Sequence, residues 1–220
     1  MKENNSKMKK ILIPVIAFAI CLAVIWKWTY GFSAFTIYSY TLKEAGNSPR
    51  PLPDFQMMDQ NGNMFNLKDK HKYVLINFVY LDCPSACHKV NNQIDQIYHL
   101  FSGAVVPEKL EFVTVSFDLK DDNITKIKNY RNLYGNDIDG WTFALPYHFN
   151  QQDFTRLLRK IGIWTYTIPE TGVINHSLYL FLISPDNKII KIFDPARDDN
   201  HTIIEQINKC LQEKKISSLS

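Results

Sequence analysis

Two cysteines stand four residues apart at the point where a buried strand is expected to give way to a helix. They are Cys83 and Cys87, in the segment Tyr80-Leu-Asp-Cys-Pro-Ser-Ala-Cys-His88. A cysteine in the first turn of a helix meets unpaired backbone N–H groups and the positive end of the helix dipole, which lower the pKa of its thiol. The thiolate attacks disulfides and also binds soft metals. Because a spacing of four places both sulfurs on one side of the first turn, the pair can close a disulfide or share a metal ion.

Copper is the metal that this pair would favour if an imidazole joined it, because soft sulfur ligands select Cu(I). Zinc normally takes four protein ligands, and iron–sulfur clusters need more cysteines than this part of the chain offers. The third ligand must then be one of the histidines, which are His71, His88, His99, His148, His176 and His201.

His176 is the strongest candidate among them. It stands where a loop enters the predicted strand Ser177–Ile183, and in a thioredoxin plan that point lies beside the helix that carries the cysteines. His99 is expected on the solvated side of its helix, and His88 points about 100° away from Cys87. Any one of these histidines could instead be a solvated or hydrogen-bonded side chain that holds no metal.

The elements predicted around these residues alternate between strand and helix patterns. Asn61-Gly62 between two short segments predicts a β-hairpin over residues 55–67. Continuous apolar runs predict buried strands, and apolar residues three and four apart predict helices. The predicted strands are Tyr73–Val79, Leu110–Phe117, Trp141–Leu145, Ser177–Ile183 and Lys188–Phe193, and the predicted helices are Ala86–Phe101, Asn123–Tyr134, Gln152–Ile161 and Thr202–Lys214.

This order predicts the fold class, but it leaves the order of strands in the sheet open. Strands separated by helices most simply pair in parallel, whereas the tight turn Ser184–Asn187 forces its two strands to be antiparallel. We therefore expect an α/β fold, a thioredoxin-like mixed sheet with an N-terminal β-hairpin, preceded by one transmembrane helix.

The transmembrane helix is predicted from the uncharged, mostly apolar run Ile11–Trp26. The run is slightly short of the about 20 residues that a span needs, but Lys27 can extend it by snorkelling, and Trp28 and Tyr30 suit a bilayer interface. Lysines at positions 2, 7, 9 and 10 precede it. They predict a single-pass protein of the inner (plasma) membrane with its amino terminus inside and its folded domain extracytoplasmic, or periplasmic.

A cleaved signal peptide is the alternative reading of this run. Its small-x-small pattern, Ala17-Phe18-Ala19, comes after too few apolar residues, and Ile20 is a poor residue before a lipidated Cys21. We therefore divide the chain into a cytoplasmic basic tail (1–10), a transmembrane anchor (11–28), a linker (29–50) and a thioredoxin-like copper-binding domain (51–215).

Composition limits the other classes of function. Apolar residues make up 45% of the chain and charged residues 21%, with a formal net charge of +3, as in a globular domain. The basic residues form no dense stripe interleaved with aromatics, so we expect no nucleic-acid partner. The four cysteines include only one close pair, which is too few for a disulfide-stapled scaffold. Cys210 is expected on the face of the last helix that packs against the sheet, outside the site.

Four segments of the chain resemble the Sco (SenC-like) proteins, which are copper chaperones and thiol oxidoreductases for the assembly of cytochrome c oxidase. The resemblance runs from about Pro51 to Lys214 and includes the anchor. The segments are Leu52-Pro-Asp-Phe55 with the Asp59–Gly62 turn, Cys83-Pro-Ser-Ala-Cys87, Val115-Ser-Phe-Asp118 with Asp121-Asp122, and Asn175-His176-Ser177 leading into Tyr179–Ile183 and Ser184–Asn187. It implies that Cys83 and Cys87 are thiolate ligands and His176 an imidazole ligand of one copper ion, with Cu(I) favoured and Cu(II) allowed.

The sequence departs from the family pattern at three places. His88 follows the second cysteine where proline is usual, Asn175 precedes the ligand histidine where aspartate is common, and Leu119-Lys120 replaces a proline-containing pattern after Asp118. The first change could add a ligand, and the second removes a negative charge near the metal. Both bear on copper affinity and on the preference between oxidation states.

The resemblance implies a metallochaperone that hands copper to a cytochrome c oxidase subunit (the CuA site) or another copper protein at the membrane. Cys83 and Cys87 could also act as a catalytic redox pair, so enzyme activity is left open. The competing hypotheses are an extracytoplasmic thiol–disulfide oxidoreductase that keeps partner cysteines reduced, and a copper-sensing or copper-buffering protein. Only a ligand histidine separates the first hypothesis from the second, because plain disulfide exchange has no obvious use for one.

Overall fold

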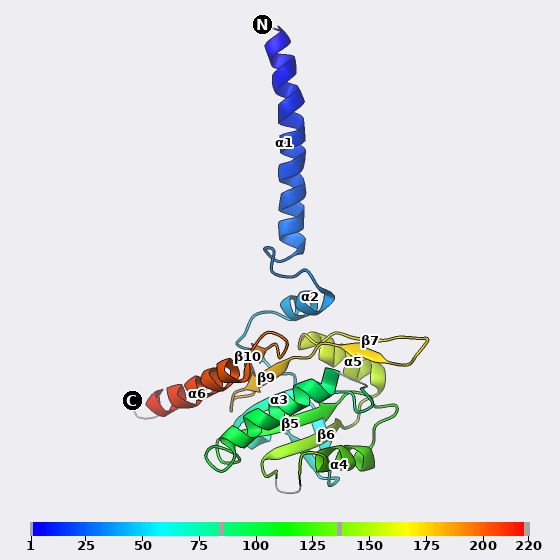
Figure 1. The fold of residues 1–220 in the computed structure, drawn as a ribbon, viewed down its shortest axis with the longest axis vertical. Coiled ribbons are helices and arrows are strands. Elements are labelled where there is room, and N and C mark those ends of the chain that lie inside the picture. The colour runs from blue at the N-terminus through cyan, green and yellow to red at the C-terminus, as the bar shows by residue number, and fades with distance from the viewer. Residues whose placement is uncertain (1, 84–85, 136–137, 218–220) are drawn as a thin grey trace.

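The structure is a computed structural model that describes residues 2–83, 86–135 and 138–217, and the side chains of residues 2–9, 86–88 and 213–217 lie outside its described part. Figure 1 shows a long helix, α1 (Lys2–Trp28), that stands away from a folded domain. Between them lies a short helix, α2 (Ile37–Glu44). Helix α1 contains a segment, Lys10–Trp28, that is long and apolar enough to cross a membrane, and none of that segment is buried inside the protein.

A mixed sheet forms the centre of the domain, and within the described residues it has eight strands in the order β1-β10-β9-β4-β5-β6-β2-β3. Strands β4, β5 and β6 are parallel to one another, and the other neighbours are antiparallel. The strands are β1 (Arg50–Pro51), β2 (Gln56–Asp59), β3 (Met64–Asn66), β4 (Tyr73–Val79), β5 (Leu110–Ser116), β6 (Trp141–Pro146), β9 (Leu180–Ile183) and β10 (Lys188–Phe193). In the described part of the chain, two further strands, β7 (Thr165–Thr167) and β8 (Ile174–His176), form a separate two-stranded sheet.

Helices cover both faces of this sheet because its central strands are apolar on both sides. On one face, Ile76 and Phe78 of β4 pack in a core with Phe154 of helix α5. On the other face, Leu75 of β4 packs in a second core. That second core takes residues from three helices, which are α3 (Ala86–Phe101), α4 (Ile124–Asn132) and α6 (Asn200–Ser217). Helix α5 spans Gln151–Lys160, and a 3₁₀ turn, Leu67–Lys70, follows β3.

The predicted fold class is confirmed, including the N-terminal hairpin of β2 and β3 and the antiparallel pair of β9 and β10. Strands β4 and β10 and helix α3 have the bounds predicted from the sequence. The predicted strand Ser177–Ile183 is wrong at its start. Residue His176 ends strand β8 of the separate hairpin, and the sheet strand begins only at Leu180.

The segment 29–50, predicted to be a linker, contains helix α2 and the first residue of strand β1, Arg50. Helix α2 begins with a capping box, in which the backbone N–H of Ser39 donates to Thr36 and that of Thr36 donates to Ser39. Its inner face carries Thr41, which is buried, and Leu42, which packs on the core beside α5. The segment therefore joins the folded domain instead of hanging free from it.

Candidate metal centre

Cys83 lies just beyond the carboxyl end of β4, in a tight turn that leads to α3. The turn is closed by the backbone N–H of Cys83, which donates to the carbonyl of Tyr80 at 3.1 Å. The Cys83 side chain is half-buried and packs against the core on the α5 face of the sheet. Cys87 follows in the first turn of α3, where the backbone N–H groups of a helix are unpaired. The side chains of Cys87 and His88 lie outside the described part of the structure.

Buried hydrogen bonds fix helix α3 against the sheet. Asn77 of β4 donates to the side-chain carbonyl of Asn91 of α3 at 3.3 Å, and Asn91 donates in turn to the hydroxyl of Tyr130. Thr114 of β5 donates to Asn77 at 2.8 Å. Because buried polar groups that lose a partner are costly, this network holds the helix that carries Cys87 in one position relative to β4.

His176 ends strand β8, opposite Thr165 of β7. The next residue holds it in place, because the Ser177 N–H donates to the carbonyl of Trp164 at 2.9 Å and the Trp164 N–H donates back to the Ser177 hydroxyl at 3.0 Å. The residue His176 is 8% exposed, and its imidazole meets the ring of Phe117 edge-on, with 4.7 Å between centroids.

One hydrogen bond sets the tautomer of His176. Its Nδ1 lies 3.0 Å from the carbonyl oxygen of Ser177, and a carbonyl can only accept, so Nδ1 carries the proton. In the neutral ring Nε2 then holds the lone pair, which is the form in which an imidazole binds a metal. A backbone carbonyl on the other ring nitrogen is also the usual way in which proteins orient a metal-binding histidine.

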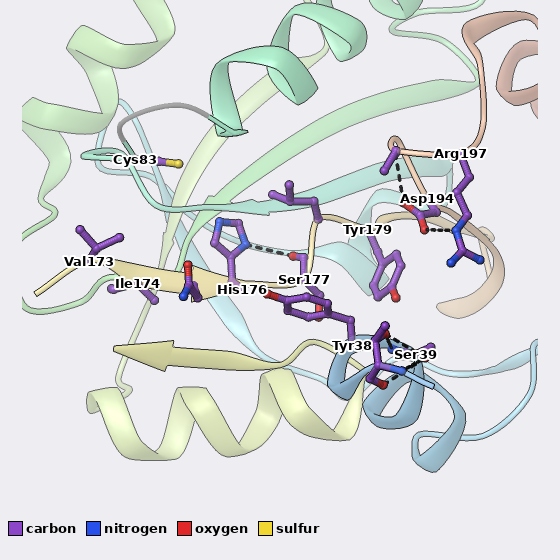
Figure 2. A pocket seen from close by; sticks show the side chains of 14 residues that line it. Tyr38, Ser39, Cys83, Val173, Ile174, His176, Ser177, Tyr179, Asp194 and Arg197 are labelled. Atoms are coloured by element: carbon purple, nitrogen blue, oxygen red, sulfur yellow. Dashed lines mark hydrogen bonds and ion pairs between the residues drawn. The ribbon is translucent and has the colours of Figure 1, made fainter. Parts of the chain in front are cut away.

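Cys83 and His176 line the same pocket, a cavity of about 440 Å³. Figure 2 shows the sulfur of Cys83 and the ring of His176 on the same side of it, one reaching in from the end of β4 and the other from β8. A wall across the pocket comes from Tyr38 and Ser39 of α2. Among the side chains that the structure describes, no three from His, Cys, Asp and Glu form a metal-binding group, and Cys87 is outside that set.

The other described histidines lie apart from this pocket. His71, His99, His148 and His201 are exposed. His99 lies 3.4 Å from Asp95 one turn earlier, which agrees with its predicted place on the solvated side of α3. Cys210 is buried in the core on the opposite face of the sheet from Cys83, as expected for a residue outside the site.

Three carboxyl groups, those of Asp82, Asp118 and Asp122, surround the turn that carries Cys83. Burial raises the pKa of Tyr80, and the negative charges of these aspartates and of Cys83 raise it further. Lys126 offsets part of this charge, with Nζ at 2.9 Å from Asp82 and 3.7 Å from Asp122. The surroundings of the Cys83 turn are therefore acidic, which favours a bound cation.

The side chain of Asp122 is fully buried. Burial raises its pKa, the hydroxyl of Ser116 opposes that shift by donating to Oδ2, and the charge of Asp118 adds to it. Both Ser116 and Asp118 come from the strand end Val115–Asp118, so the structure brings this predicted segment beside the turn that carries Cys83.

Motif reasoning did not predict the roles of several residues around His176 and its pocket. Phe117 contacts His176, and Tyr38, Tyr179, Asp194 and Arg197 line the pocket. The one signal for the α2 wall is Thr36-x-x-Ser39, a helix-start pattern that precedes Gly46 at the helix end. That pattern shows where a short helix can form, but not which surface of the domain it packs on.

Comparisons with known proteins agree with this arrangement. The family model described as SCO1/SenC matches residues 44–212. No curated protein matches the chain. Among solved structures, a SCO1/SenC family lipoprotein from Bacillus anthracis is 21% identical with a TM-score of 0.65, and the match covers 74% of this chain and 97% of that one.

Two other solved structures are similar to the chain at lower identity. Yeast Sco1 with copper bound is 17% identical with a TM-score of 0.62, over 74% of this chain and 90% of that one. BsSco, a member of the Sco family of cytochrome c oxidase assembly proteins solved in a study of a disulfide switch, is 17% identical with a TM-score of 0.62, over 75% of this chain and 95% of that one. These likenesses establish the common fold.

Proposed function

Because this chain belongs to the SCO1/SenC family, we propose that it is a membrane-anchored copper chaperone that supplies copper to cytochrome c oxidase during assembly of the CuA site. In this proposal the cargo is one Cu(I) ion, held by the thiolates of Cys83 and Cys87 and by Nε2 of His176. The copper bound in yeast Sco1 and the oxidase-assembly role named for the family of BsSco support the proposal.

The observation that carries the proposal is that His176 lines the same pocket as Cys83 and has its Nδ1 3.0 Å from the Ser177 carbonyl, a contact that leaves Nε2 as the ligand atom. Two thiolates and one imidazole suit Cu(I), and a three-ligand site leaves room for a recipient's thiolates to enter and take the ion by ligand exchange. Binding releases protons from the thiols, so copper affinity should rise with pH over the range in which the thiols ionise. The acidic surroundings of the Cys83 turn also favour a cation.

We infer that α1 is an uncleaved span and that the domain faces the extracytoplasmic side. The length and apolar composition of Lys10–Trp28 and the lysines that precede this segment support the inference. On that side of the membrane a thiol pair can be oxidised, and copper can pass between proteins of the cell envelope. The pair is therefore expected to bind copper only while it is reduced.

A titration tests this proposal. The full chain in detergent is reduced and titrated anaerobically with Cu(I) in the presence of a competing chelator, and the same protein with Cys83 and Cys87 joined in a disulfide is the control. We expect one tightly held copper in the reduced form and none in the oxidised form, because ligation needs thiolates. Equal retention by both forms would place the copper site elsewhere.

A thiol–disulfide oxidoreductase is the second candidate, favoured by the position of Cys87 in the first turn of α3 and by the disulfide switch for which BsSco was described. The substitution His176→Ala separates the two candidates, since it removes an imidazole and leaves both thiols. A chaperone should lose the ability to rescue an oxidase-assembly defect while its disulfide exchange persists. A variant that still rescues assembly but binds copper poorly would favour the reductase.

A further inference from the structure

A cluster of exposed apolar side chains lies immediately after α1. Beyond residue 28, the large apolar side chains that are exposed within the described part of the chain are Tyr30, Phe32, Phe35, Ile37, Tyr40, Met64, Leu100, Leu133 and Tyr166. The first five fall within eleven residues, and the other four are scattered singly. Isolated exposed apolar residues are common on soluble domains, but a contiguous group marks a surface that something covers.

The cluster forms an ordered surface instead of a loose tail. The turn that joins α1 to α2 is closed by backbone hydrogen bonds from Ser33 and Ala34 to the carbonyl of Thr29, each at 2.9 Å, and by Gly31 to Trp26 at 2.8 Å. Tyr30 meets Tyr40 edge-on at 5.5 Å between centroids. Helix α2 therefore begins close to the end of the candidate span, as Figure 1 also shows.

The opposite face of α2 is docked on the domain. Tyr38 meets Trp164 edge-on at 5.3 Å between ring centroids, and Leu42 packs on the core beside α5. At the carboxyl end of the helix, the exposed Glu44 pairs with Arg159 at 3.2 Å. Gly162 lies so close to α2 that a Cβ there would stand 3.1 Å from the Cα of Leu42. Through these contacts the exposed face of α2 is fixed in direction relative to the pocket that holds Cys83 and His176.

Positive charges lie beside the carboxyl end of α2. A shallow hollow there is lined by Glu44, Ala45, Arg156, Arg159 and Lys160. The side chains of Arg156 and Arg159 are 73% and 67% exposed, and Lys43 and Lys160 are also exposed. Aromatic residues at the end of a span and basic residues beside them are the combination that binds the interface of an anionic bilayer.

We propose that α2 lies in the interface of the bilayer that α1 spans, with Phe35, Ile37 and Tyr40 among the lipid headgroups and the basic end of α5 against anionic phosphates. This surface goes beyond copper binding but rests on the proposed anchoring by α1. Because Tyr38 and Ser39 line the copper pocket from the other side of α2, the pocket opens next to the membrane surface. A recipient protein would then receive copper from a domain held at the bilayer surface, not from a domain joined to its anchor by a flexible linker.

Photo-crosslinking tests this arrangement on the full chain in lipid nanodiscs. Benzoylphenylalanine is placed, one position at a time, at Phe35, at Tyr40, at Phe18 in the middle of α1, and at Leu133. Leu133 is the matched control, because it is an exposed apolar residue, 71% accessible, at the end of α4. After illumination, mass spectrometry counts phospholipid adducts at each position.

We expect lipid adducts at positions 18, 35 and 40 and at least several-fold fewer at position 133. Adducts at 18 with none at 35 and 40 would overturn the interfacial helix and leave the anchor intact, and absence at all three would overturn both. Adducts of positions 35 and 40 to another protein instead of lipid would also overturn the proposal. Copper stoichiometry of the same samples reports on the proposed function separately.

A double variant and a control variant test the role of the basic residues. Arg156→Glu with Lys160→Glu should lower the adduct yield at position 40 several-fold in nanodiscs that contain phosphatidylglycerol, and little in phosphatidylcholine alone. The control is Lys128→Glu, an exposed charge on α4. If the adduct yield at position 40 is the same in the two lipids and is unchanged by the double substitution, the proposed contact between the basic end of α5 and anionic headgroups is wrong.

Discussion

The substitution Gly162→Ala tests whether α2 is truly part of the folded domain. Gly162 has φ +94°, and an added Cβ would lie 2.8 Å from Cδ1 and 3.1 Å from Cα of Leu42. The end of the leucine side chain can turn aside, but the Cα cannot move unless α2 moves with it. The backbone conformation alone costs an alanine about 1–2 kcal/mol, and overpacking against a fixed backbone adds about 1–3 kcal/mol.

Gly62→Ala is the matched control for the backbone cost. Gly62 has φ +84° in the β2–β3 turn, and an added Cβ there would have no neighbour within 4 Å. The difference between the two variants therefore isolates the contact with α2, and we expect Gly162→Ala to lose about 1–3 kcal/mol more free energy of unfolding. The assays are denaturant unfolding of the full chain in detergent and hydrogen exchange of the α2 amides.

Release of α2 is the expected way in which the protein relieves this clash. Amides of Thr41 and Leu42 should exchange faster in Gly162→Ala than in Gly62→Ala, because the helix is too short to persist without its tertiary contacts. Equal losses of stability in the two variants, with α2 exchange unchanged, would refute the argument that α2 packs tightly on Gly162.

Three further predictions follow from the site and its surroundings. Cys210→Ser should leave copper stoichiometry unchanged, because Cys210 is on the other face of the sheet, and loss of one equivalent of copper would contradict this placement. The variant should lose about 1–3 kcal/mol of free energy of unfolding, because it buries a hydroxyl group. Asp122→Asn should be at least as stable as the parent protein at neutral pH. Because burial raises the pKa of Asp122, its protonated side chain contributes fully to the free energy of unfolding below the pKa of an unfolded aspartate, and this contribution is lost as pH rises through the folded pKa. The stability that Asp122→Asn gains over the parent protein should therefore shrink when unfolding is measured at acid pH. If the stability of Asp122→Asn relative to the parent protein instead increased as pH falls, the direction of the Asp122 pKa shift would be wrong. A reporter fused after Ser220 and active only when exported should give signal, and a signal from a cytoplasm-only reporter would overturn the topology.

Regular patterns in the sequence were enough to predict the elements that carry the cysteines. Strand β4 is a nearly continuous apolar run, and apolar residues recur at helical spacing in α3 from Val90 to Phe101, so both elements have the predicted bounds. The start of the strand that follows His176 was predicted wrongly because Ile174–His176 pairs with Thr165–Thr167. No pattern in the local sequence indicates that pairing. The sheet order was open for the same reason, since it depends on contacts between distant segments.

The sequence predicts three ligands for the candidate site but did not predict the walls of the pocket. The cysteine spacing indicates Cys83 and Cys87, the family resemblance adds His176, and the ligand set stays a prediction. The α2 wall was missed because a helix of eight residues depends on packing, here on Gly162 and Trp164, more than on its own propensity. The role of Phe117 against His176 likewise depends on a contact between β5 and β8 that no periodicity reveals.

X-ray absorption at the copper edge tests the ligand set most directly. The reduced full chain is loaded with one equivalent of Cu(I), and its spectrum is compared with that of His176→Ala prepared in the same way. We expect two sulfur ligands and one nitrogen ligand in the parent protein, with the nitrogen lost and copper bound more weakly in the variant. A spectrum with no nitrogen ligand in the parent protein, or one that His176→Ala leaves unchanged, would contradict the proposed site.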